Sequence, residues 1–229
     1  MKNKTKIHLP ILAIFLIAAA MFTASIASPA LADWTDGYWG SVTAVVCNAT
    51  NPQHPFARVI GGNHPGVYPA TLVGSNKSET LRGTDGDDVI FGMAGNNTVQ
   101  ANGGNDIVCG GGVTDNLYGG DGDDILIGGS GKNTLNGGNG NDILIGFDAN
   151  DSLFAGAGDN LLIGGAGKDS LFGGVGNDTL YGQDADDKLF GGGGIDACDG
   201  GTHVTSDAIY GCETITYDHT PPVAAVYVP

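Results

Sequence analysis

An all-β fold of stacked coils is the structure that this sequence predicts, and three observations predict it. A nine-residue pattern repeats thirteen times from Gly83 to Asp199 without an insertion or a deletion. Its eighth position is aliphatic in every unit but the last, and its sixth position is always Asp or Asn. Glycine dominates positions one, two and four. A disordered acidic chain would tolerate this composition but would have no reason to keep the register.

Positions seven to nine of each unit are expected to form a short strand, in which position eight faces the opposite way to its two neighbours. The six residues before them must turn, and glycine permits the backbone conformations that such turns require. Two units then make one coil of 18 residues. The position-eight side chains fill the narrow space between two sheets.

Both ends of the chain lie outside this pattern. Residues 1–32 are expected to be a secretory signal peptide, because three lysines precede a short apolar run and Ala30-Leu31-Ala32 offers a small-x-small cleavage site. A retained membrane anchor is the alternative, which the shortness of the apolar run disfavours. Cleavage would leave a secreted chain that starts at Asp33, with no later segment able to span a bilayer.

The charge of the chain is strongly acidic. Removing residues 1–32 moves the formal net charge from −16 to −19, because three lysines and no acidic residues are lost. A nucleic-acid or anionic-lipid partner is therefore not expected, since both require a basic patch. Between Gly83 and Asp199 the chain carries 19 acidic residues and three lysines.

The consensus GGxGxDxUx resembles the repeats-in-toxin, or hemolysin-type, family of calcium-binding nonapeptide-repeat proteins. This resemblance implies a parallel β-roll and Ca²⁺ as the cofactor. The chemistry agrees, because carboxylates stacked about 4.8 Å apart repel each other. A hard dication held by carboxylates and loop carbonyls would turn that repulsion into cohesion.

Alternate units belong to two sides of the roll. We call the units that begin at residues 83, 101, 119, 137, 155, 173 and 191 the first series, and those between them the second series. Glycine at position four is kept throughout the first series, whereas the second series replaces it at Val113, Ala149 and Ala185 and adds Lys132 and Lys168. Calcium is therefore expected mainly along the first series and at fewer or weaker sites along the second.

The expected ligands are eleven of the thirteen position-six residues, together with two position-five carboxylates. In the first series they are Asp88, Asp106, Asp124, Asp142, Asn160, Asp178 and Asp196, with Asp87 and Asp123 beside them. In the second series they are Asp115, Asp151, Asp169 and Asp187.

The outward positions seven and nine of the first series are mostly apolar, a patch larger than a soluble monomer normally exposes. Four cysteines in an exported chain indicate two disulfides. The segment "CDGG…CE" resembles the end of exported repeats-in-toxin proteins, which implies a Cys198–Cys212 staple and leaves Cys47 to pair with Cys109. Cys109 lies in the apolar patch, so the segment from about Asp33 to Val73 is expected to cover it; a second copy is the alternative.

The expected organisation is thus a signal peptide (1–32), a covering segment (33–82), a calcium-binding β-roll (83–199) and a stapled C-terminal cap and tail (200–229). The tail either leads to a further domain or docks as a capping strand. About 50 residues precede the repeats, too few for a catalytic domain, and the histidines are scattered, so no enzyme is expected. A secreted structural or surface-associated calcium-binding protein is the favoured function, and an adhesin or secreted effector with a glycan or protein partner is the alternative.

Overall fold

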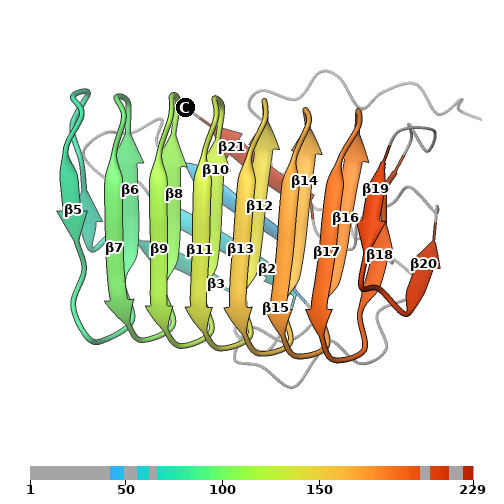
Figure 1. Ribbon diagram of the computed structural model, residues 1–229. Helices are drawn as coiled ribbons and strands as arrows, with labels where there is room; N and C mark the ends of the chain where they lie inside the picture. The colour runs from blue at the N-terminus through green and yellow to red at the C-terminus, as the bar shows by residue number, and fades with distance from the viewer. Residues whose placement is uncertain (1–41, 49–55, 62–65, 202–206, 217–223, 229) are drawn as a thin grey trace, which may run out of the picture.

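The computed structural model describes residues 42–48, 56–61, 66–201, 207–216 and 224–228. All regular structure in these ranges is β-strand, in three sheets (Figure 1). Two sheets form a solenoid of stacked coils, and the strands of the third sheet pair only with one another. No helix in the described ranges is long and apolar enough to cross a membrane. The expected signal peptide, residues 1–32, lies outside the described residues.

The first-series strands form a nine-stranded parallel sheet in the order β20-β18-β16-β14-β12-β10-β8-β6-β4. Its strands are β4 (Leu72–Val73), β6 (Val89–Met93), β8 (Ile107–Gly111), β10 (Ile125–Gly129), β12 (Ile143–Asp148), β14 (Leu161–Ala166), β16 (Thr179–Asp184), β18 (Ala197–Asp199) and β20 (Thr214–Thr216). Neighbours pair 18 residues apart within the repeats, as Leu126 with Leu144, which confirms the two-unit coil.

The second-series strands form an eight-stranded parallel sheet in the order β19-β17-β15-β13-β11-β9-β7-β5. Its strands are β5 (Thr80–Arg82), β7 (Thr98–Gly103), β9 (Asn116–Asp121), β11 (Thr134–Asn139), β13 (Ser152–Ala157), β15 (Ser170–Val175), β17 (Lys188–Gly193) and β19 (Ala208–Tyr210). Most strands are longer than the three residues expected, because pairing between coils continues into the first loop residues, as Gly138 with Gly156.

The position-eight side chains lie between the two sheets and are fully buried from Ile90 to Leu189. Leu81 and Cys198 extend this row at its two ends. Burial of each aliphatic side chain stabilises the fold by about 1.5–3 kcal/mol. The interior is one side chain deep on each sheet, so the coils depend on each other for burial.

The third sheet confirms that the apolar outer face of the first-series sheet is covered in cis. It contains β1 (Val42–Asn48), β2 (Phe56–Gly61), β3 (Gly66–Pro69) and β21 (Ala224–Val228) in the order β21-β1-β2-β3. In Figure 1 it lies behind the solenoid. Cys47 and Ala57 of this cover sheet are buried in one cluster with outward residues of β6 to β14, such as Ile127.

Two disulfides fasten these parts together. Cys47 of β1 is bonded to Cys109 of β8, and Cys198 of β18 is bonded to Cys212 in the last coil, which are the expected pairings. The described part of the C-terminal tail, strand β21, pairs in parallel with β1. A strand from the tail therefore completes the cover sheet that the N-terminal segment begins.

Candidate metal centre

The thirteen position-six residues, eleven of which are expected ligands, form two rows of buried polar side chains, one in the loops of each series. All thirteen are between 0% and 7% exposed. Ionised groups are rarely buried unless they are paired or coordinate a metal. These rows therefore require an electrostatic partner for every carboxylate that stays charged.

One oxygen of each side chain joins neighbouring coils. The Oδ1 atom of Asp106 accepts a hydrogen bond of 2.7 Å from the backbone N–H of Asp88, and Asp124 Oδ1 accepts one of 2.8 Å from Asp106 N–H. The same contact, from the position-six residue one coil earlier, recurs at Asp115, Asn133, Asp142, Asp151, Asn160, Asp169, Asp178, Asp187 and Asp196. Position six thus bonds the loops into two continuous ladders.

In every position-six aspartate except Asp88, the second carboxylate oxygen is buried and has no hydrogen-bond partner. These Oδ2 atoms belong to Asp106, Asp115, Asp124, Asp142, Asp151, Asp169, Asp178, Asp187 and Asp196. A buried polar atom without a partner costs about 1–3 kcal/mol, and more when it is charged. A regular column of them is the feature of the loops that most clearly calls for a cation.

Glycine at position one leaves the space beside these oxygens open. A Cβ atom on Gly119 would lie 2.1 Å from Asp124 Oδ2 and 2.7 Å from the carbonyl oxygen of Gly137 in the next coil. In the second series, a Cβ on Gly146 would lie 2.4 Å from Asp151 Oδ2 and 2.5 Å from Gly164 O. Carboxylate and carbonyl oxygens therefore converge in both series without a side chain between them.

Burial raises the pKa values of these carboxyl groups towards and above neutrality. The pKa of Asp124 rises to about 8, because burial destabilises the ionised form and Asp142, Asp106 and Asp123 add like charge. The values are about 8 for Asp151, about 7 for Asp106, Asp142 and Asp187, and about 6 for Asp169 and Asp178, with burial as the largest cause in each. Burial also raises the pKa of Asp115 and of Asp196.

Asp88, in the first coil of the repeats, differs from the rest. Burial acts to raise its pKa, but hydrogen bonds from the Thr84 backbone and from the Thr71 and Thr84 hydroxyls bring the pKa below its ordinary value. Both of its oxygens accept hydrogen bonds, Oδ1 from Thr71 and Oδ2 from Thr84. Asp88 therefore differs from the other position-six aspartates, because both of its carboxylate oxygens already accept hydrogen bonds.

Asp87 and Asp123, the expected position-five ligands, belong to a different ladder. Asp87 Oδ1 accepts a hydrogen bond from Asn105 N–H at 2.8 Å, and Asp123 Oδ1 accepts one from Asn141 N–H at 2.7 Å. The donor here is one coil later, the reverse of position six. Asp87 is exposed and Asp123 is half-buried. These residues bond the loops together at the surface and lie outside the buried rows.

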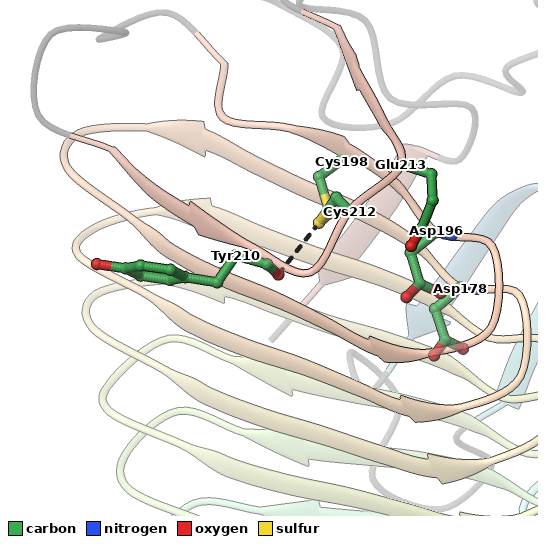
Figure 2. Close-up of a disulfide and its surroundings, with 6 residues drawn as sticks. All are labelled: Asp178, Asp196, Cys198, Tyr210, Cys212 and Glu213. Carbon is green, nitrogen blue, oxygen red and sulfur yellow. Dashed lines mark hydrogen bonds between the residues drawn. A yellow bond between two sulfur atoms is a disulfide. The ribbon is translucent and has the colours of Figure 1, made fainter.

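Three carboxylates that the nonapeptide register missed extend the rows. Asp207 Oδ1 accepts from Asp187 N–H at 2.9 Å, and Glu213 Oε2 accepts from Asp196 N–H at 2.6 Å. Figure 2 shows Asp178, Asp196 and Glu213 following one another along the last coils, near the Cys198–Cys212 disulfide. At the other end, Glu79 N–H donates to Asn97 Oδ1 at 3.2 Å.

A weaker sequence signal would have found these three residues. Each begins a tetrapeptide of the form acid-x-aliphatic-x: Glu79-Thr-Leu-Arg, Asp207-Ala-Ile-Tyr and Glu213-Thr-Ile-Thr. The preceding glycine pattern is incomplete, and the coil step before Asp207 is 20 residues instead of 18. The tetrapeptide keeps its pattern even where the glycine loop before it is altered, because the strand and the ladder contact both depend on it.

Where a contact of a second-series lysine is defined, that contact lies outside the buried row of position-six side chains. Lys168 Nζ pairs with the exposed Asp186, at position five of the next second-series loop. Loops of both series share the ladder and the open oxygens, so the position-six geometry does not separate them. Preferential calcium binding along the first series stays a prediction.

Side chains alone do not make a metal site in these loops. Among the described residues, no three His, Cys, Asp or Glu side chains are close enough together to hold an ion. Carboxylate and carbonyl oxygens are, however, the ligands that Ca²⁺ takes in proteins. The open Oδ2 atoms and the adjacent carbonyls of position-one residues fit such a cation, with backbone oxygens completing its shell.

A family comparison agrees with this chemistry. The family described as RTX calcium-binding nonapeptide repeat (4 copies) matches residues 73–108, 82–117, 110–144, 145–180 and 163–198. No curated protein is significantly similar in sequence to the chain. The matched segments together cover more than half of the chain and coincide with the two stacked sheets. The chain therefore belongs to the RTX calcium-binding nonapeptide-repeat family.

Proposed function

We propose that this chain is a secreted, non-enzymatic calcium-binding β-roll protein with a structural or surface-associated role, and that Ca²⁺ drives its folding. The observation that carries the proposal is the column of buried Oδ2 atoms without hydrogen-bond donors. Bound calcium would supply the positive charge that these oxygens lack. Candidate ligands are the position-six aspartates of both series, with the first series favoured.

The chain's own residues explain why folding and binding are linked. Stacking the coils brings acidic loops together, and between Gly83 and Asp199 only three lysines accompany 19 acidic residues. The ladders and the position-eight row exist only in the stacked state, so an unfolded chain has no preformed site. Extracellular calcium modules bind with dissociation constants of about 10⁻⁴–10⁻³ M, which suits a protein that folds after export.

A calcium titration of the purified chain without residues 1–32 tests this proposal. Circular dichroism in a chelator is expected to show little β-structure at slightly alkaline pH, and calcium is expected to restore it cooperatively. Magnesium at equal concentration is the control, because it prefers a rigid octahedral shell and gives up its waters reluctantly. Full β-structure in the chelator would contradict calcium-driven folding.

Export is tested separately from folding. Sequencing of the protein recovered from the culture medium is expected to give an N-terminus at Asp33, as the Ala30-Leu31-Ala32 site predicts. Recovery of the full-length chain in the cell membrane would instead support a retained anchor.

An adhesin or effector role is the second candidate, and one surface favours it. The outward row at position nine of the second-series sheet exposes aromatic rings, with Tyr118 41%, Phe154 38% and Tyr210 57% exposed. Aromatic residues are enriched at protein interfaces. Loss of binding to extracted cell envelopes in a Phe154→Ala variant with an unchanged calcium titration would favour this role over a purely structural one.

A further inference from the structure

Three position-six residues are asparagine instead of aspartate, and their amide groups make contacts that the aspartates lack. Asn97 Nδ2 donates to the carbonyl oxygens of Gly92 at 3.2 Å, Ala94 at 3.4 Å and Gly95 at 3.3 Å. Asn133 Nδ2 donates to Gly131 O at 2.9 Å and Gly129 O at 3.4 Å. These carbonyls all belong to the asparagine's own loop.

Asn160 repeats the arrangement in the first series. Its Nδ2 donates to Gly158 O at 2.8 Å and to the Asp178 carboxylate of the next coil at 2.9 Å. Gly95, Gly131 and Gly158 all stand at position four, so the position-four carbonyl is the acceptor common to the three loops. The amide thereby donates to its own loop and, at Asn160, also to Asp178 Oδ1, the oxygen that accepts the ladder contact.

The amide nitrogen occupies the place that Oδ2 takes in an aspartate loop. The missing Cβ of Gly128 would lie 2.7 Å from Asn133 Nδ2, as that of Gly146 would lie 2.4 Å from Asp151 Oδ2. All three asparagines keep the ladder contact through Oδ1. The position-six side chains of these loops therefore differ at one atom. In asparagine it is Nδ2, a hydrogen-bond donor, and in an aspartate such as Asp151 it is Oδ2, an acceptor without a partner.

We propose that Asn97, Asn133 and Asn160 take the place of a metal ion in their loops, so that these three loops hold their coils together without calcium. An amide brings its own donor to the converging carbonyl oxygens, and it adds no charge that a cation must balance. The roll would then contain three calcium-independent loops among its thirteen repeat units. This inference rests on the proposed calcium binding, and it changes the expected role of Asn160 from ligand to substitute for the ion.

The proposal predicts opposite effects for opposite substitutions. Asn160→Asp replaces the donor with an open oxygen, so the variant is expected to bind one more calcium ion per chain at saturation and to unfold more readily in chelator. Asp124→Asn does the reverse, with one calcium ion fewer and more β-structure retained in chelator. The triple variant Asn97→Asp/Asn133→Asp/Asn160→Asp is expected to bind three more.

Bound calcium is counted by native mass spectrometry of chains refolded in saturating calcium, and chelator stability is followed by circular dichroism. Asn136→Asp is the matched control, because it adds the same charge at an exposed strand position one coil away. Its calcium count is expected to equal that of the unmodified chain. A variant that fails to fold in chelator is still counted, because the count is made with calcium present.

The outcomes separate this inference from the function on which it rests. An unmodified chain that binds no calcium overturns the proposed function itself. An unmodified chain that binds calcium, with counts unchanged in Asn160→Asp and in Asp124→Asn, overturns the asparagine inference alone.

Discussion

At the scale of single residues, the position-six aspartates place two oxygens in unlike surroundings. One oxygen accepts a backbone hydrogen bond from the preceding coil, and the other is buried without a donor. Protonation of the second oxygen removes its charge without breaking the ladder contact. Calcium and protons therefore relieve the same electrostatic cost, and each is expected to replace the other as the condition for folding.

This competition predicts a pH dependence of the metal-free chain. Folded-state pKa values run from about 6 for Asp178 to about 8 for Asp124, above the ordinary 3.8 of the unfolded chain. A raised folded-state pKa contributes stability that is complete below the unfolded pKa and is lost as the pH rises through the folded one. In chelator, the thermal midpoint is thus expected to be higher at about pH 5 than at about pH 8.5.

Circular dichroism melts across that window, with and without calcium, check this sign. The stabilisation that calcium adds is expected to grow with pH, because calcium binds the ionised carboxylates and displaces their protons. A metal-free chain that is equally stable at both ends of the window, or more stable at alkaline pH, would show that the carboxylates are ionised in the folded state without calcium.

Glycine at position four makes a second prediction at this scale. Gly140 has a φ of 135°, and a Cβ there would lie 2.2 Å from the carbonyl oxygen of Gly122 in the preceding coil. Gly140→Ala is therefore expected to cost about 1–3 kcal/mol of the free energy of unfolding in calcium, through overpacking against rigid backbone. Urea denaturation measures this loss.

Gly86→Ala is the matched control, since Gly86 also stands at position four. Its φ is not positive, and the nearest atom to a Cβ would be Thr84 Oγ1 at 3.9 Å. Its free energy of unfolding should change little. Equal losses in the two variants would indicate that the effect comes from chain entropy and not from the contact with Gly122. Ala149 and Ala185 already hold positive φ values of 70° and 82°, which marks their loops as strained relative to glycine loops.

At the scale of strands, the constant register between neighbouring strands aligns side chains at the same repeat position into a row across the sheet. Phe154, Phe172 and Phe190 stand on β13, β15 and β17 with ring centroids 4.8 Å apart, and Tyr210 of β19 continues the stack at 5.1 Å. Position nine of the second series points away from the interior, so these rings are not part of the buried position-eight row. In the structure they stabilise one another across the strands of the second-series sheet.

Phe172 has a stacked phenylalanine ring on each side, Phe154 and Phe190. Phe172→Ala is expected to lower the free energy of unfolding by about 1–3 kcal/mol in calcium, because two aromatic contacts of about 0.5–1.5 kcal/mol are lost. Denaturant titration measures this, and Asn136→Ala is the control, because Asn136 lies in the same outward row between Tyr118 and Phe154 but has no ring of its own. Equal effects of the two changes would mean that the rings contribute no more than any surface side chain.

Strands were the most predictable elements of the fold, and the reason is the register. A two-residue period inside a nine-residue repeat leaves one arrangement in which every position-eight side chain is buried and every acidic loop is at an edge. The cover sheet had no such period. The apolar outward positions of the first series and Cys109 among them predicted a cover, but the pairing of β21 with β1 joins Ala44 to Ala224 and has no local signal.

The candidate site was predictable in residue type and less so in detail. Position six identified the buried rows because a single polar residue recurs there among glycines. The direction of the ladder contacts depends on atoms of two coils at once, and the donor contacts of the asparagine amides depend on how each loop is folded. The nine-residue repeat describes the residue types of one unit, whereas these contacts depend on the three-dimensional arrangement of the loops.

At the scale of the whole molecule, charge and apolar surface are segregated. Acidic loops line both edges of the roll, and none of the first-series loops contains a lysine or an arginine. The apolar outer strip of the first-series sheet is covered by the four-stranded sheet, so Ile125 and Ile143 are fully buried. Calcium would hold the edges together while the cover sheet protects the strip.

The Cys47–Cys109 disulfide cross-links the cover sheet to the roll, and its removal tests whether the cover sheet stays in place without it. It closes a sequence separation of 62 residues, for which the chain-entropy model gives roughly 4 kcal/mol. The roll has its own ladders and interior row, so Cys47→Ala/Cys109→Ala should keep calcium-induced β-structure. The cover sheet should separate more often, which would raise the binding of a hydrophobic dye and promote self-association through the uncovered strip.

Dye fluorescence and sedimentation in calcium measure these effects, and Cys198→Ala/Cys212→Ala is the control. That disulfide closes a separation of 14 residues within the last coils, so its loss should loosen β18 and β20 and leave the strip covered. If both double variants bind dye alike, the apolar contacts of Cys47 and Ala57 with the strip are sufficient to hold the cover in place. If only the Cys47→Ala/Cys109→Ala variant binds dye, the Cys47–Cys109 disulfide is what chiefly holds the cover sheet against the strip.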